Sequence, residues 1–166
     1  MTERQYGGTF EELAMPLFDA LYRYARCLAR ERAEAEDLVQ ETYVKALRGF
    51  GSFTPGTNFR AWIFRILRNT FLTSRTGLRE TPVDDDTPVA VESTTPEHLL
   101  MRKFTRESLQ RAIEALPAGF REVLVLTDVE EMSYKEIAET LSIPVGTVAS
   151  RLIRARARLR KTLEGL

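Results

Sequence analysis

The chain has few of the residues on which most enzymes and metal proteins depend. Its 166 residues include one cysteine, Cys27, and one histidine, His98. A lone cysteine excludes an intrachain disulfide framework, and a lone histidine argues against a zinc site. Phosphate loops, metalloprotease motifs and nucleophile elbows are also absent. We therefore predict no catalytic residue, metal, cofactor or small-molecule substrate, and Cys27 is interpreted as a buried apolar side chain.

Long hydrophobic runs are missing as well. No apolar stretch approaches the roughly 18 residues that a membrane span needs. The first residues do not form a basic and then apolar signal sequence. We therefore expect a cytoplasmic protein without membrane insertion.

Net charge is also lacking, because 24 basic residues balance 24 acidic ones. The balance is uneven along the chain. Residues 1–79 carry 12 basic and 9 acidic side chains, residues 80–100 carry 6 acidic and no basic ones, and residues 101–166 again carry 12 and 9. An acidic connector thus cancels two mildly basic blocks, and neutrality of the whole does not exclude a nucleic-acid partner.

The connector predicts a boundary between domains. Residues 80–100 contain three prolines and no helical period, so a flexible linker is expected, with a long surface loop as the alternative. The flanks, 1–79 and 101–166, each show apolar residues at spacings of three and four. We predict an all-α protein of two small helical domains, the second containing a helix-turn-helix, joined by an extended acidic linker.

The expected helices are bounded by recognisable signals. Pro16 should interrupt the first apolar stripe. A second helix is expected over about 33–47, and Thr57 or Asn58 should cap a third over about 59–71. In the second domain, Pro117 should end one helix and Ser133 should open another through a capping box.

The last helix, predicted over about 146–163, follows a short turn after the capped helix, which is the helix-turn-helix pattern. Arg151, Arg154, Arg158 and Lys161 recur on it at spacings of three and four, with no acid between residues 140 and 163. A solvated helix is the alternative, but such helices usually interleave glutamate. Unneutralised cations on one face favour a DNA partner.

A second acid-free stretch, residues 42–79, carries seven basic residues. On the third helix, Arg65, Arg68 and Asn69 lie off the apolar stripe. Trp62 and Phe71 lie within it and are expected in the core. Phe64 lies outside it and is the better candidate for stacking on an unpaired base.

The second helix differs in sign. Glu34, Asp37 and Glu41 fall on one face, with Gln40 beside them. This face is either an ordinary solvated surface or a docking surface for a basic partner.

Three segments together carry a family resemblance. EAEDLVQETYVKAL (34–47), GTNFRAWIFRILRNTF (56–71) and residues 116–160 resemble, in order and spacing, the extracytoplasmic-function sigma factors of bacterial RNA polymerase. The resemblance implies a region 2-like domain over 1–79, which binds core polymerase and the minus-ten promoter element. It also implies a region 4-like domain over 101–166, which binds the minus-thirty-five element. Partners would be core polymerase, duplex and melted promoter DNA, and an anti-sigma factor.

The resemblance assigns three sets of site residues. The polymerase-binding set is Glu34, Asp37, Leu38, Gln40 and Glu41. The minus-ten set is Asn58, Arg60, Phe64, Arg65, Arg68 and Asn69, of which Asn69 matches a base-reading position. The minus-thirty-five set is Lys135, Thr147, Ala149, Ser150, Arg151, Ile153, Arg154, Arg156 and Arg158, with Ser150, Ile153 and Arg154 facing bases and Arg151 and Arg156 facing phosphates.

Two details qualify the resemblance. Ala149 stands where the family often has lysine or arginine, which removes one DNA contact, although alanine can meet a thymine methyl group. The stretch ELAMPLFDALY (12–22) resembles the disulfide-stress branch, whose members are commonly held by a zinc-containing, redox-sensing anti-sigma protein.

Other functions stay open at this point. A stand-alone dimeric helix-turn-helix regulator would explain the last helix but neither the acid-free third helix nor the acidic face. An enzyme has no motif in its favour. The linker, through Asp84–Asp86, is hypothesised to cover the basic faces of the free protein.

Overall fold

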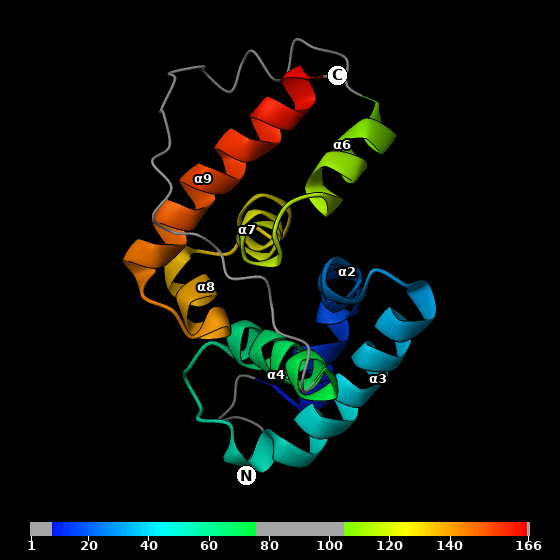
Figure 1. The fold of residues 1–166 in the computed structure, drawn as a ribbon. Helices are drawn as coiled ribbons and strands as arrows, with labels where there is room; N and C mark the ends of the chain where they lie inside the picture. Colours follow the sequence, from blue (N-terminus) through cyan, green and yellow to red (C-terminus); the bar gives the residue numbers. More distant parts are fainter. Residues whose placement is uncertain (1–7, 76–104, 166) are drawn as a thin grey trace.

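The structure is a computed structural model that describes residues 8–75, the N-terminal half, and 105–165, the C-terminal half. Every regular element in these two ranges is helical, as predicted (Figure 1). The helices are α1 (Phe10–Ala14), α2 (Phe18–Ala29), α3 (Arg32–Gly49), α4 (Phe59–Ser74), α6 (Arg106–Glu114), α7 (Ala118–Leu124), α8 (Tyr134–Leu141) and α9 (Val145–Glu164). The predicted acidic linker, with Asp84–Asp86, and the single histidine, His98, lie outside the described residues.

The signals expected in the N-terminal half act as predicted. Pro16 lies in a 3₁₀ turn that separates α1 from α2. Asn58, rather than Thr57, caps α4, since its Oδ1 accepts a hydrogen bond of 3.0 Å from the Ala61 amide. An asparagine at this position satisfies an amide that the helix itself cannot pair. The cap therefore fixes where α4 begins.

The C-terminal half contains the predicted helix-turn-helix. Ser133 Oγ accepts from the Glu136 amide at 3.1 Å and Glu136 Oε1 accepts from the Ser133 amide at 3.3 Å, so the capping box starts α8. Ser142 ends α8 in the left-handed conformation, with φ of 55°. After Pro144, α9 begins at Val145, one residue earlier than predicted.

The two halves pack against each other. Helix α8 lies against α4, and α7 lies against α2 (Figure 1). The apolar core is continuous between them, because buried residues of the N-terminal half, such as Leu21 and Phe64, belong to the same cluster as Phe120 and Ile137 of the C-terminal half. The sequence predicts two small cores, and the structure joins them into one.

None of the helices within 8–75 and 105–165 is long and apolar enough to cross a membrane.

Candidate polymerase and nucleic-acid interfaces

The acidic face of α3 is present on the surface. Asp37, Gln40 and Glu41 are exposed, and Glu41 is 3.4 Å from Lys45 one turn later. Glu34 is half-buried and forms an ion pair with Arg75 at the end of α4. The open part of this face is therefore centred on Asp37, Gln40 and Glu41.

Leu38 does not belong to that face. Its side chain is only 6% exposed and is part of the core cluster. The assignment of Leu38 as a direct polymerase contact is therefore wrong for this structure, because its position on α3 points into the helix packing with Ala35 and Val39. Its role is to hold α3 in place.

The polar residues of α4 divide into two rows. Arg65 and Asn69, one turn apart, are exposed, as is Asn58 at the start of the helix. Arg60, Phe64 and Arg68, at i, i+4 and i+8, form a separate row. The row of Arg65 and Asn69 is the more open to solvent, because Arg60 and Arg68 in the other row pair with carboxylates of the C-terminal half.

The structure contradicts the expectation that Phe64 is available to stack on an unpaired base. Its side chain is fully buried, and its ring stacks on that of Tyr24 with centroids 5.5 Å apart. It therefore cannot stack on an unpaired base in this arrangement. Trp62 and Phe71 are partly buried against the core, in agreement with their expected place in the apolar stripe.

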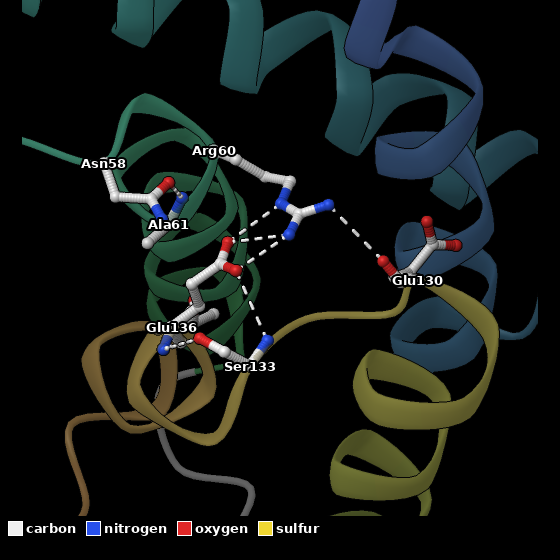
Figure 2. Close-up of polar contacts among 7 residues, drawn as sticks. Asn58, Arg60, Ala61, Glu130, Ser133 and Glu136 are labelled. Carbon is white, nitrogen blue, oxygen red and sulfur yellow. Dashed lines mark hydrogen bonds and ion pairs between the residues drawn. The ribbon is translucent and has the colours of Figure 1, made fainter.

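Arg60 is held by carboxylates and carbonyls of the C-terminal half (Figure 2). Its Nε and Nη2 donate to Glu136 at 2.9 and 2.8 Å, and its Nη1 donates to the Glu130 carbonyl at 3.4 Å. Burial opposes ionisation of Glu136, but the hydrogen bonds from Arg60 and Ser133 outweigh it and lower the pKa of this carboxyl. Glu136 thus both caps α8 and pairs with α4.

Arg68 pairs with a deeply buried carboxylate. Glu122 of α7 is 2% exposed and accepts from Arg68 Nε at 3.0 Å and from the Tyr24 hydroxyl at 3.0 Å. Burial and the Glu122 charge both raise the pKa of Tyr24 well above its ordinary value, so Tyr24 stays a neutral donor. A third pair joins Arg23 of α2 to Glu130, with Nε 2.7 Å from the carboxylate.

These partners were not found by sequence reasoning. Arg23, Glu122 and Glu130 carry no motif, and Glu136 is recognisable only as a helix cap. Each pair joins residues at least 54 positions apart in the chain. The only signal for them is the presence of carboxylates in a half that is basic overall, which does not specify a partner.

Helix α9 presents the predicted minus-thirty-five residues at graded exposure. Ile153 is 54% exposed, one of several large apolar side chains on the surface of the described residues. Of the other members on α9, Thr147, Ala149, Ser150, Arg151 and Arg154 are half-buried and Arg156 and Arg158 are exposed; Lys135, also exposed, lies on α8. The helix therefore offers an apolar contact surrounded by cations.

Some α9 side chains also have intramolecular partners. Arg156 Nη2 is 2.6 Å from Asp128, and the Arg158 guanidinium lies over the Phe120 ring, 5.2 Å from its centroid. The Ser150 hydroxyl donates to the Thr147 carbonyl. Exposed pairs such as Arg156 with Asp128 stabilise a protein by little, so this arginine can exchange its carboxylate for a phosphate.

The environment of Cys27 agrees with its interpretation as a packing residue. It is partly buried against the core, and burial raises the pKa of its thiol to about 12. A thiol with this pKa holds very little of the reactive thiolate at neutral pH. Among the described residues no group of histidine, cysteine, aspartate and glutamate side chains could hold a metal ion.

Cys27 should therefore react slowly with thiol reagents. In the native protein at pH 7, we expect its modification by a disulfide reagent to be at least about 100-fold slower than that of an unfolded control, because the thiolate is scarce. The measurement is the rate of chromophore release with and without 8 M urea. Equal rates in the two conditions would contradict the burial of this thiol.

The two halves together define a class of protein: an all-helical pair of domains, one with a basic helix beside an exposed acidic face, the other with a helix-turn-helix. The Sigma-70 region 2 family matches residues 13–80, and the Sigma-70 region 4 family matches residues 106–159. The matches coincide with the two halves and leave the acidic connector between them.

Individual relatives agree with this division. The chain is 37% identical to the ECF RNA polymerase sigma factor SigE of Mycolicibacterium smegmatis over 95% of its own length and 66% of that relative's. It is 33% identical to the RNA polymerase sigma-H factor of Pseudomonas aeruginosa, covering 80% of this chain and 75% of that one. The protein belongs to the extracytoplasmic-function sigma factor family.

A solved structure matches both halves at once. The sigma factor RpoE of Bartonella quintana, solved in complex with the anti-sigma factor NepR, superposes with a TM-score of 0.71 at 28% identity. The match covers 93% of this chain and 96% of that one. The similarity therefore extends over both halves and confirms the predicted all-α, two-domain fold.

Proposed function

We propose that the protein is a promoter-specificity subunit that binds core RNA polymerase and directs transcription initiation from a dedicated set of promoters. The observation that carries this proposal is the joint match of regions 2 and 4 in one chain, in the order that places an acidic α3 face, a basic α4 and a helix-turn-helix in succession. Polymerase performs the nucleotidyl transfer, and this protein is not an enzyme.

Each surface has a role in the proposal. Asp37, Gln40 and Glu41 dock on the polymerase. Arg65 and Asn69 contact the melted minus-ten element, where an asparagine side chain can donate to and accept from one base edge. Helix α9 enters the major groove at the minus-thirty-five element with Ile153 and Arg154 foremost.

An anti-sigma factor is the proposed regulator. The similarity to RpoE, which was solved bound to NepR, supports it. The protein acts in the cytoplasm, where polymerase and DNA are. A stress regulon, and membership of the disulfide-stress branch, remain predictions from the sequence. With one cysteine and one histidine in the chain, redox sensing by a thiol pair or zinc would belong to the partner.

The test is transcription in vitro with core polymerase over a library of random promoters. The expected result is initiation from templates that share two sequence elements. Deleting either element from the template should abolish initiation. Transcripts without any shared upstream element, or no transcripts, would overturn the proposed function.

Reversing the charge at Asp37 should weaken polymerase binding. Asp37→Lys places a cation on the docking face, and a like charge against a basic partner should lower affinity for core polymerase by about tenfold or more. Fluorescence anisotropy of labelled protein measures the affinity, and thermal unfolding verifies the fold. Glu36→Lys, also exposed on α3 but outside the predicted set, is the matched control. Equal losses in both variants would count against the assignment.

Replacing Arg154 and replacing Arg156 should affect DNA binding in different ways. Arg154→Ala should cost roughly 1–3 kcal/mol at the preferred minus-thirty-five sequence and relax base preference there, because a base contact is lost. Arg156→Ala should weaken binding evenly across sequences, because only a phosphate contact is lost. Binding of each variant with core polymerase to a library of upstream sequences measures both. An even loss for Arg154→Ala would reassign it to the phosphates.

A further inference from the structure

Helix α9 has an outward side that carries no charged residue over its first three turns. Val148, Leu152 and Ala155 are buried, at 0%, 1% and 0% exposure, and mark the side of α9 that packs against α7 and α8. The helical repeat of 3.6 residues places four residues on the opposite side, which we call the outer row: Gly146, Ser150, Ile153 and Ala157. The outer row therefore contains no lysine, arginine, asparagine or glutamine.

The outer row offers few hydrogen-bond donors to the edge of a base. The Ser150 hydroxyl donates to the Thr147 carbonyl at 3.1 Å, so its proton is already used within the helix. A Cβ added at Gly146 would meet nothing within 4 Å, so no neighbouring side chain fills the space in front of this residue. Ala157 is half-buried and carries only a methyl group. The row therefore presents mainly apolar surface to a partner.

Ile153 is the largest side chain of the outer row and is 54% exposed. One turn earlier, Ala149 is half-buried and carries only a methyl group, so no long side chain covers Ile153 from that position. In the major groove of DNA, the C5-methyl of thymine is the one apolar group that base pairs present. An apolar side chain that reaches the base edges therefore favours thymine.

Cations border the outer row on both sides. The helical repeat places Arg154 and Arg158 along one side of it and Arg156 along the other. A major groove provides the complementary pattern, because its base edges lie between two strands of phosphates. The charge of the margins therefore selects duplex DNA as the occupant of this surface.

We propose that Ile153 is a specificity residue that selects thymine in the minus-thirty-five element by contact with the 5-methyl group, as the outer row approaches the base edges between the flanking arginines. The proposal rests on the proposed function, which places α9 in the major groove. It adds the chemical class of the group that the helix reads, a 5-methylated pyrimidine. It also requires at least one A·T pair in the upstream element.

The test removes the methyl group from the DNA and leaves the base pairing unchanged. Deoxyuridine pairs with adenine as thymidine does and lacks only the C5-methyl. The protein with core polymerase binds a duplex promoter selected in the transcription library, in which deoxyuridine replaces one upstream thymine at a time. At the thymine that Ile153 contacts, affinity should fall about fourfold, the effect expected for one buried methyl group. Deoxyuridine between the two elements should leave the affinity unchanged.

Replacing Ile153 should abolish the discrimination between thymine and uracil. Ile153→Ala should bind the thymine promoter at least about fourfold more weakly, with no further loss on the uracil promoter, because both changes remove the same contact. Val129→Ala is the matched control, since Val129 is 50% exposed but precedes α8, and this variant should discriminate like the parent. Thermal unfolding should be nearly unchanged in both variants, because both side chains are exposed.

The possible results separate this proposal from the proposed function. Transcription without any shared upstream element would overturn the proposed function and thymine selection together. A shared upstream element without an A·T pair, or a change of less than about twofold with deoxyuridine at every thymine, would overturn thymine selection alone. A full deoxyuridine effect that persists in Ile153→Ala would show that another group contacts the methyl and would overturn the assignment to Ile153.

Discussion

Replacing Glu122 with alanine should lower the free energy of unfolding by about 3–5 kcal/mol, the largest effect expected for any charged residue in the chain. Glu122 is 2% exposed and accepts hydrogen bonds from Arg68 and from Tyr24, which is itself fully buried. Removing one member of a buried pair costs far more than the net contribution of the intact pair, because the other member stays behind in a medium of low polarity.

Urea unfolding of the full chain measures this loss. Glu139→Ala, an exposed change on α8, should alter stability by no more than about 0.5 kcal/mol. The double variant Glu122→Ala with Arg68→Ala should lose less unfolding free energy than the sum of the two single variants, because each single variant already breaks the ion pair. Strictly additive losses would mean that the Arg68 and Glu122 side chains do not stabilise each other.

Phe64→Ala should be the second large effect, a loss of about 3–5 kcal/mol of unfolding free energy. The ring is fully buried and stacked on Tyr24, so its removal leaves a cavity between α2 and α4 next to the C-terminal half. Arg65→Ala, the neighbouring and exposed residue, should leave stability nearly unchanged while weakening DNA binding.

The two variants discriminate between the roles of adjacent residues. Thermal or urea unfolding gives stability, and affinity for a single-stranded oligonucleotide gives DNA binding. If Phe64 were a surface residue that stacks on bases, its replacement would leave stability intact and reduce only DNA binding. That result would contradict the packing described here.

Phe64 illustrates the limit of sequence reasoning on this protein. The apolar stripe that contains Trp62 and Phe71 predicts the face of α4 that packs within its own half, and a residue outside that stripe is interpreted as exposed. The structure gives α4 a second buried side, which faces the other half of the chain. Periodicity reports how many sides of a helix are apolar but not which partner covers a side of mixed composition.

The elements themselves were predictable because their signals are local. The Asn58 cap, the Pro16 interruption and the Ser133 capping box each depend on residues within one helical turn. The acidic face of α3 was predictable for the same reason. Leu38 was misassigned because membership of a family motif does not distinguish residues that contact a partner from residues that hold the helix in place.

The ion pairs Arg23–Glu130, Arg60–Glu136 and Arg68–Glu122 were not predictable, because they form between segments that are distant in the sequence. Nothing near Arg68 in the sequence indicates Glu122, and a basic row beside an aromatic residue is equally typical of a DNA-binding surface and of a charged contact between domains. The basic row indicates that its partner is an anion. It does not indicate whether that anion is DNA or a carboxylate of the same chain.

Glu136 also restricts which amino acids position 136 can accept. Glutamine would retain the hydrogen bond to the Ser133 amide but not the charge that Arg60 requires. Aspartate would keep the charge on a side chain one methylene shorter, which cannot span both contacts. Lysine would supply neither. A helix start and a contact between domains therefore depend on one side chain, and a substitution there that spares the helix still changes how the two halves meet.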